Sequence, residues 1–231
     1  MKIYRLLSEK VKQLKQVIIF DMDGTLYTHD EYLRSQFDLP IKRLAKLQKK
    51  TFNQMKREIS EYRKMWAEEH GGKSVSLGNI FLSFGISIEK TISWREELYR
   101  PEDYLSEDKL LRSSLEKLVK HFTLAVITNN PVSIAVRTLN VLGVQDLFHT
   151  IAGLDTCMVS KPNEVIFKKV LQDCCVNAQQ CISIGDRFDI DIALALKLNM
   201  GGILVEEIGD IYELPDLLLT DSVLTSDNKK R

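Results

Sequence analysis

The sequence of 231 residues has few of the cysteines on which a disulfide framework or a zinc site depends. Its four cysteines are Cys157, Cys174, Cys175 and Cys181, and none of them forms a Cys-x-x-Cys pair or lies beside a histidine cluster. Structural zinc sites are built from such pairs, so we expect none. Free thiols in apolar or helical segments are common in reducing compartments, so we expect a cytoplasmic protein.

Net charge and long apolar runs are also missing. Lys plus Arg and Asp plus Glu both number 32, so the chain has no overall basic field for a nucleic acid polymer or an anionic membrane. The apolar run Val17–Phe20 is short and ends in acids, and Met1–Gln16 contains scattered lysines. We therefore expect neither a signal peptide nor a membrane span. The sequence gives no indication of the oligomeric state.

Hydrophobic residues make up 44% of the chain, enough for a substantial core. The central stretch is Val17–Phe20, four apolar and mostly β-branched residues, followed directly by Asp21, Asp23 and Gly24. This pattern predicts a buried strand that ends in two carboxylates. Ligands of open α/β sheets bind at that end of the strands, and adjacent acids there favour a metal ion. An ordinary polar turn would also use Asp and Gly.

Two later strands end in similarly polar segments. Phe122–Ile127 runs into Thr128-Asn129, and Pro131 then opens a helix, so Thr128 is either a helix cap or part of an anion site. Cys181–Ile184 runs into Gly185-Asp186, with Asp189 and Asp191 at the start of the next helix. Acids favour a helix start, but three of them exceed what capping needs, and oxygen ligands of this kind suit Mg²⁺.

Lys161 precedes Pro162 and a helical pattern. A lysine is electrostatically unfavourable at the start of a helix unless an anion lies beside it. A solvated loop is the alternative.

The segment Asp21-Met22-Asp23-Gly24-Thr25-Leu26 resembles the first motif of the haloacid dehalogenase-like hydrolases, most of which are phosphatases. Thr128, Ser160-Lys161-Pro162 and the segment from Gly185-Asp186 to Asp191 resemble the other three motifs, in the same order along the chain. Four motifs in the family's order make agreement by chance improbable.

The resemblance implies a role for each matching residue. Asp21 is expected to be the nucleophile and Asp23 the general acid and base. The side chains expected to bind phosphate are those of Thr128, Asn129 and Lys161. The expected Mg²⁺ ligands are Asp21, Asp186, Asp191 and the main-chain carbonyl of Asp23. Asp189 has a weaker claim than Asp191, and which of the two binds the metal directly is left open.

Between the first two motifs the sequence predicts helices only. Long amphipathic stretches such as Ile41–Gln54 and Met55–Glu69 are separated by breaks at Pro40, Gly71-Gly72, Gly85 and Pro101. The resemblance implies that this insertion is a helical cap over the active site. Its loop residue Lys73 could present a cation to the substrate, although a helix C-cap glycine followed by a solvated loop explains the same sequence.

We therefore expect an α/β fold with a doubly wound parallel sheet, formed by residues 1–27 and 112–231, and an inserted α-helical cap formed by residues 28–111. Ile3–Gln16 has helical spacing and is expected to form a short amphipathic helix or a tail packed beside the first strand. The segment after Pro215 reads as a tail with a polar end at Ser226–Arg231. The expected enzyme is an Mg²⁺-dependent phosphoric monoester hydrolase that acts on a small phosphorylated metabolite through an aspartyl-phosphate. The phosphoglycolate phosphatase and pyrimidine 5'-nucleotidase groups are the most similar. A sugar-phosphate mutase and a catalytically idle binding protein on the same fold remain alternatives.

Overall fold

The structure is a computed structural model that describes residues 1–8, 11 and 14–219, and its centre is a six-stranded sheet. The strand order is β1-β6-β5-β2-β3-β4, in which the neighbours from β6 to β4 are parallel and β1 is antiparallel to β6. The strands are β1 (Lys2–Arg5), β2 (Val17–Phe20), β3 (Thr123–Ile127), β4 (Thr150–Ala152), β5 (Cys181–Gly185) and β6 (Gly201–Leu204). The expected parallel sheet is confirmed.

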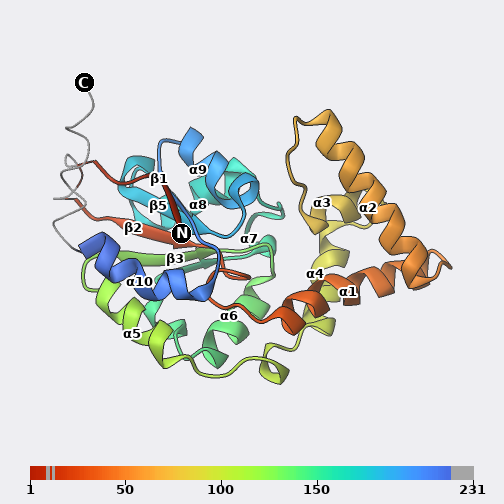
Figure 1. Cartoon of the computed structure of the whole chain (residues 1–231), viewed down its shortest axis with the longest axis horizontal. Helices are drawn as coiled ribbons and strands as arrows, with labels where there is room; N and C mark the ends of the chain where they lie inside the picture. The colour runs from red at the N-terminus through yellow and green to blue at the C-terminus, as the bar shows by residue number, and fades with distance from the viewer. Residues whose placement is uncertain (9–10, 12–13, 220–231) are drawn as a thin grey trace.

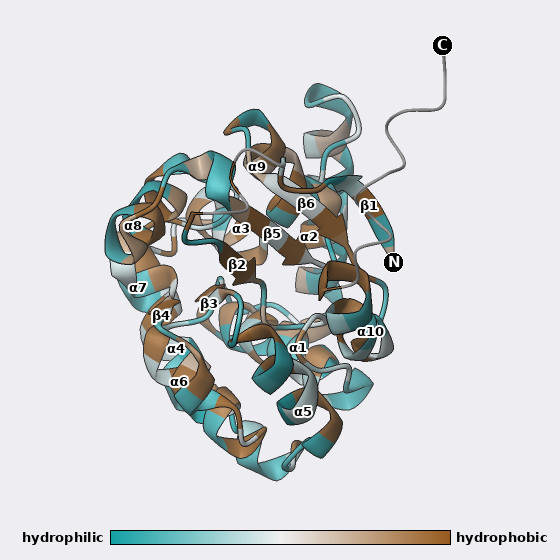
Figure 2. Cartoon of the chain, turned by 90° about the vertical axis from the view of Figure 1, so that its left-hand side faces the viewer, coloured by the Kyte–Doolittle hydropathy of each residue, from teal (hydrophilic) through white to brown (hydrophobic). Residues whose placement is uncertain are grey.

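Helices cover both faces of the sheet, because successive side chains of a strand point to opposite faces. Val17 and Ile19 of β2 pack with apolar residues of α8 and α9, whereas Ile18 and Phe20 pack with those of α5, α6 and α10. Figure 1 shows the first pair of helices above the sheet and the other three below it. Figure 2 shows β2 and β5 as hydrophobic ribbons inside the molecule. These helices are α5 (Lys109–Leu118), α6 (Val132–Val141), α8 (Glu164–Cys174), α9 (Ala193–Lys197) and α10 (Ile208–Leu219).

Four further helices lie beside the sheet and have a hydrophobic core of their own (Figure 1). They are α1 (Asp30–Leu47), α2 (Phe52–Glu69), α3 (Leu77–Ser83) and α4 (Ile88–Leu98). We call them the α1–α4 unit. The expected breaks at Gly71-Gly72, Gly85 and Pro101 each follow a helix end. That residues 28–111 form a cap domain remains a prediction.

Short elements complete the described chain. They are α7 (Leu154–Cys157), the 3-10 helices η2 (Pro101–Asp103), η3 (Gln145–Leu147) and η4 (Ala178–Gln180), and the π-helix η5 (Phe188–Ile192). The π-helix follows β5 and carries Asp189 and Asp191.

The helix expected over Ile3–Gln16 is wrong where the structure describes that segment. Lys2–Arg5 is instead an edge strand, paired with β6. Helical spacing of leucines did not decide the conformation, because the free edge of β6 offers hydrogen bonds that tertiary contact alone reveals. Residues 9–10 and 12–13 lie outside the described residues.

The expected break at Pro40 is also wrong, because α1 runs through this proline to Leu47. Proline leaves the carbonyl four residues earlier without its helical hydrogen bond. Here that carbonyl belongs to Gln36, and the Tyr99 hydroxyl donates to it at 2.6 Å. The actual break lies at residues 48–51, inside the expected Ile41–Gln54 stretch.

The C-terminal expectation is partly wrong, since α10 includes Pro215 and extends to Leu219. The polar end Ser226–Arg231 lies outside the described residues. In the part of the chain that the structure describes, no helix is both long and apolar enough to cross a membrane.

Candidate active site

Three strand ends bring polar residues to one edge of the sheet. Asp21 follows β2, Thr128 follows β3, and Asp186 follows β5. β2 pairs in parallel with both β3 and β5, with Phe20 level with Val126 on one side and Ile184 on the other. The carboxyl ends of all three strands therefore coincide, and the side chains that follow them share one site.

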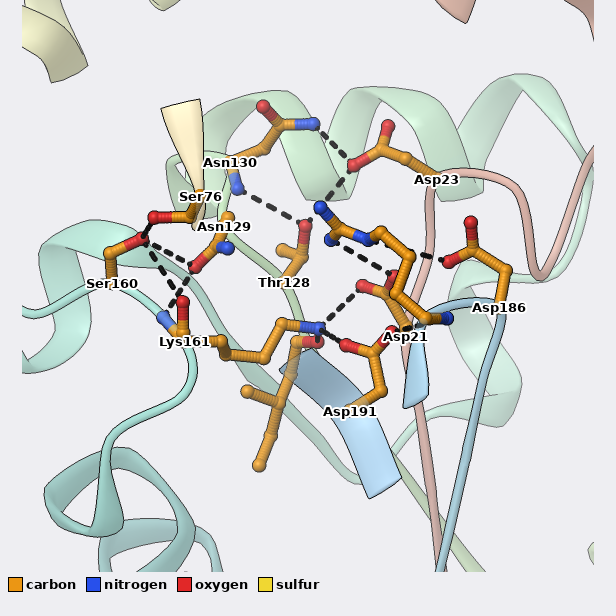
Figure 3. Close-up of polar contacts among 12 residues, drawn as sticks. Asp21, Asp23, Ser76, Thr128, Asn129, Asn130, Ser160, Lys161, Asp186 and Asp191 are labelled. Atoms are coloured by element: carbon orange, nitrogen blue, oxygen red, sulfur yellow. Dashed lines mark hydrogen bonds and ion pairs between the residues drawn. The ribbon is translucent and has the colours of Figure 1, made fainter. Parts of the chain in front are cut away.

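Lys161 lies at the centre of this site and is 1% exposed. Its ammonium group donates to Asp21 Oδ1 and Asp191 Oδ1, both at 2.7 Å, and to the carbonyl of Ile127 at 2.8 Å (Figure 3). Burial alone lowers the pKa of a lysine, but the charges of Asp191 and Asp21 outweigh it and raise the pKa of Lys161 above its ordinary value. Lys161 is therefore a fixed positive charge beside the Asp21 carboxylate.

A cluster of three acids has the donor set of a divalent cation site. One carboxylate oxygen each of Asp21, Asp186 and Asp191 lies within 4.8 Å of the others. Asp21 Oδ2 and Asp186 Oδ1 are buried and have no hydrogen-bond partner among the described residues, and only the longer ion-pair contacts of Arg187, at 3.8 and 3.7 Å, reach them. Buried anionic oxygens need such a partner or a cation, and carboxylates are the ligands that Mg²⁺ prefers. The residues present thus fit a hard divalent metal ion.

Burial, and after it the charge of Asp21, raise the pKa of Asp186 to about 7. The Asp186 side chain also comes close to Gly24, which has a φ of 81°. A Cβ at position 24 would lie 2.8 Å from Asp186 Oδ2. Glycine is therefore required both by the left-handed turn and by this approach.

Asp189 lies outside the acid cluster, although it is only two residues from Asp191. Its Oδ2 accepts a hydrogen bond of 3.0 Å from the backbone N–H of Ser74, in the loop between α2 and α3. Asp189 therefore connects the α1–α4 unit to the sheet.

Asp23 points away from the acid cluster (Figure 3). Tyr27 donates its hydroxyl to Asp23 Oδ1 at 2.5 Å, and Gln36 donates in turn to that hydroxyl at 2.9 Å. On the other side, the Asn130 amide and the Thr128 hydroxyl donate to Asp23 Oδ2 at 2.8 and 3.4 Å. Burial and the nearby charge of Asp21 raise the pKa of Asp23. This acid is thus held in place by three side chains, one of which is itself fixed by Gln36, and it takes up a proton more readily than a free aspartate.

Asn129 positions the lysine loop. Its Oδ1 accepts hydrogen bonds from the backbone N–H of Lys161 at 2.7 Å and from the Ser160 hydroxyl at 3.1 Å. Ser160 also contacts the Ser76 hydroxyl, the N-cap of α3, at 2.8 Å. The α1–α4 unit therefore touches the residue next to Lys161.

A cavity of about 290 Å³ opens between the sheet edge and the α1–α4 unit. Its polar lining includes Asp23 and Asp186 from the sheet edge and the side chains of two arginines, Arg95 and Arg187. Lys73 does not line it and is exposed, with no ion pair among the residues described. The substrate role of Lys73 stays a prediction. The complete lining is Asp23, Leu33, Gln36, Phe37, Ser76, Leu77, Arg95, Tyr99, Asn129, Asn130, Asp186 and Arg187.

Sequence reasoning missed several residues of this site: Tyr27, Gln36, Arg95, Asn130 and Arg187. Arg187 lies 3.8 Å from Asp21 Oδ2 and 3.7 Å from Asp186 Oδ1. A signal existed for Arg95, because Thr91 and Trp94, on the buried side of α4, precede it by four and one positions. An arginine at such a position is buried with them.

The family model described as haloacid dehalogenase-like hydrolase matches residues 18–205 of this sequence. A phosphoglycolate phosphatase from Psychrobacter arcticus is 26% identical over 197 residues, which cover 80% of this chain and 81% of that protein.

Solved structures resemble the fold. The HAD phosphatase from Thermococcus onnurineus has a TM-score of 0.61 at 19% identity and covers 89% of this chain and 98% of its own. The HAD-hydrolase YfnB from Bacillus subtilis, solved bound to magnesium, has a TM-score of 0.55 at 16% identity and covers 87% of this chain and 99% of its own.

Proposed function

Because this chain belongs to the haloacid dehalogenase-like hydrolase family and is a phosphatase, we propose that it hydrolyses a small phosphate monoester. The proposed reaction proceeds through an aspartyl-phosphate on Asp21, with Mg²⁺ as cofactor. The observation that carries the proposal is the buried contact of Asp21 with Lys161 at 2.7 Å, beside two further acids. A carboxylate without such charges would repel the phosphate dianion that it has to attack.

In the first step an oxygen of Asp21 attacks phosphorus, and the bond from phosphorus to the leaving oxygen breaks. Asp23 gives its proton to that oxygen, so the product leaves as an alcohol. In the second step Asp23 takes a proton from water, which attacks the phosphoryl group. The carboxylate of Asp21 and inorganic phosphate are released.

Lys161 and Thr128 hold the phosphoryl group in both steps. The hydroxyl comes from the end of β3 and the ammonium group from the loop between α7 and α8, and they contact Asp23 and Asp21, respectively. Negative charge on the transferring oxygens would therefore be stabilised by donors that are already in place. Thr128 is fully buried, and its hydroxyl also accepts the backbone N–H of Asn130 at 3.1 Å. This hydrogen bond fixes the Thr128 hydroxyl at the turn that leads from β3 into α6.

Mg²⁺ would be held by Asp21 and Asp186, with Asp191 binding directly or through water and the Asp23 main-chain carbonyl as a further ligand implied by the resemblance. Both Asp191 oxygens already accept hydrogen bonds, from Lys161 at 2.7 Å and from the backbone N–H of Arg187 at 3.1 Å. When bound, the ion supplies positive charge that reduces the repulsion between the Asp21 carboxylate and the phosphate.

Removal of divalent metal tests the function. We expect release of phosphate from 4-nitrophenyl phosphate to fall at least about 100-fold in EDTA and to recover with added Mg²⁺. Independently of activity, saturating Mg²⁺ should raise the Tm by about 5 °C, because it binds only the folded acid cluster.

Asp186→Asn should abolish the Mg²⁺ shift in Tm. The matched variant Asp189→Asn changes an acid outside the cluster and should keep the shift. If neither the Tm nor the activity changed on addition of EDTA or Mg²⁺, the metal assignment would be contradicted. Absence of phosphate release under all conditions would favour an idle binding protein.

The hydrogen bond from Tyr27 to Asp23 gives a second prediction. Tyr27→Phe removes the 2.5 Å bond that orients the acid and should lower kcat about 10-fold with KM changed less than twofold, since a bond to a charged group contributes about 1.5–3 kcal/mol. Steady-state kinetics measures both constants.

The control for this variant is Tyr32→Phe. Tyr32 is equally buried, but its hydroxyl has no hydrogen-bond partner among the described residues. The Tyr32→Phe variant should keep kcat within about twofold of the wild-type value. Equal losses in the two variants would mean that packing rather than orientation of Asp23 is affected.

A small substrate is favoured by the size of the cavity, about 290 Å³. The relative from Psychrobacter arcticus bears the name phosphoglycolate phosphatase, which supports a small phosphorylated metabolite here as well.

A further inference from the structure

Arg95 is a buried cation that the mechanism above does not use. It lies in the second half of α4, is 5% exposed, and lines the cavity together with Asp23. Long cationic side chains normally reach solvent. An arginine buried at a cavity wall therefore needs a partner that explains its position.

The protein supplies only neutral partners to Arg95. Its Nη1 donates to the main-chain carbonyl of Asn129 and, at 3.1 Å, to Oδ1 of Asn130. Its Nε is buried and has no hydrogen-bond partner, and no acidic side chain lies within ion-pair distance, 4.0 Å, among the residues described. Asp23 is an acid whose charge interacts with Arg95 from beyond that distance. A buried charge without a direct ion pair is costly, so an anion from outside the chain is the natural partner.

The position of Arg95 identifies the part of the substrate concerned. Asn130 accepts a hydrogen bond from Arg95 through Oδ1 and donates one to Asp23 through Nδ2. A single side chain, that of Asn130, therefore links Arg95 to the proposed general acid. Asp23 serves the leaving group, whereas Lys161 and Asp21, the proposed phosphoryl site, are not among the residues that line this cavity. Arg95 therefore faces the leaving group and not the phosphate.

We infer that Arg95 binds a carboxylate on the leaving group, so that the substrate is a small phosphate monoester that carries a carboxylate. The inference depends on the proposed function and adds the substrate class. Both hydrogen bonds of the guanidinium leave from Nη1, so Nε and Nη2 have no hydrogen-bond partner among the described residues, and these two nitrogens form the edge of an arginine that matches a planar carboxylate. A cavity of about 290 Å³ favours this small anion over a larger one.

Two phosphate esters of nearly equal size test the inference. 2-Phosphoglycolate has the carboxylate, and 2-hydroxyethyl phosphate has a neutral hydroxymethyl group in its place. We expect Arg95→Met to lower kcat/KM for 2-phosphoglycolate about 10- to 100-fold, mainly through KM, and to change that for 2-hydroxyethyl phosphate less than threefold. Arg95→Lys keeps the charge without the planar edge and should give an intermediate loss on 2-phosphoglycolate alone.

The control is Arg100→Met, which removes an exposed arginine five residues along the chain, bonded to the carbonyls of Glu96 and Tyr99. It should leave both substrates within twofold of the wild type. Equal losses on the two substrates in Arg95→Met would overturn the inference, because Arg95 would then only fasten α4 to the Asn129–Asn130 turn. A clear preference of the wild type for an ester with a second phosphate would also overturn it.

Binding separates this inference from the proposed function. Calorimetry on Asp21→Asn should detect 2-phosphoglycolate, and Asp21→Asn/Arg95→Met should bind it about 10- to 100-fold more weakly. This difference requires no turnover. Absence of hydrolysis of every ester by the wild type would reject the phosphatase proposal, and unchanged binding in the double variant would reject the role of Arg95.

Discussion

Asp21→Asn should lower kcat for any phosphate monoester by about 10⁴-fold or more, because the amide that replaces the carboxylate is a poor nucleophile. The variant keeps the size of the side chain and its place after β2, where Asp21 is 4% exposed. The loss should therefore appear in kcat and not in folding. Initial rates of phosphate release measure it, and mass spectrometry of the quenched wild type should detect one phosphoryl group on the peptide that contains residue 21.

Asp103→Asn is the matched control, since Asp103 is an exposed acid in η2 and should retain full activity. If Asp21→Asn kept its rate within about tenfold of the wild type, Asp21 would not be the nucleophile. A phosphorylated peptide that lacks residue 21 would contradict the assignment in the same way.

Lys161→Met should destabilise the fold by about 3–5 kcal/mol and lower kcat/KM by about 10³-fold. Lys161 is the only side chain among those described that forms ion pairs of 2.7 Å with both Asp21 and Asp191. Its removal leaves these carboxylates buried without their counter-charge. Urea denaturation in EDTA measures the free energy of unfolding without compensation by a metal ion.

The matched control for this variant is Lys168→Met. Lys168 forms an exposed ion pair with Glu164 on α8, and such pairs contribute about 0–1 kcal/mol. If Lys161→Met changed the free energy of unfolding by less than about 1 kcal/mol, the contacts of its ammonium group would be weaker than the structure indicates. An unchanged kcat/KM would contradict its role at the phosphoryl group.

The strand-end residues could be predicted from the sequence because their signal is local. A buried strand is recognised by a run of apolar residues, and Asp21, Thr128 and Asp186 directly follow such runs. Parallel pairing of β2 with β3 and β5 then necessarily places them at one edge. The resemblance to the haloacid dehalogenase-like hydrolases, which rested on the same segments, is confirmed by the family match over residues 18–205.

The cavity wall could not be predicted in this way. Arg95 and Asn130 are 35 positions apart, and Ser76 and Ser160 are 84 apart, yet both pairs are in contact. Such contacts depend on how the α1–α4 unit packs against the sheet, which no local pattern encodes. The expectation for Lys73 relied on a loop glycine pair and overlooked the buried arginine in α4.

By itself, the sequence determined the strands β2, β3 and β5, the order of the polar residues that follow them and the family, because each is specified by residues that are neighbours in the chain. The tertiary structure alone decided that Lys2–Arg5 joins the sheet as an edge strand and that α1 continues through Pro40. It also decided that Arg95 lines the cavity and is bonded there to neutral groups. Each of these depends on a partner distant in sequence, namely β6, the Tyr99 hydroxyl and the Asn129–Asn130 turn. Burial and hydrogen bonding to distant groups outweigh local propensity at such positions.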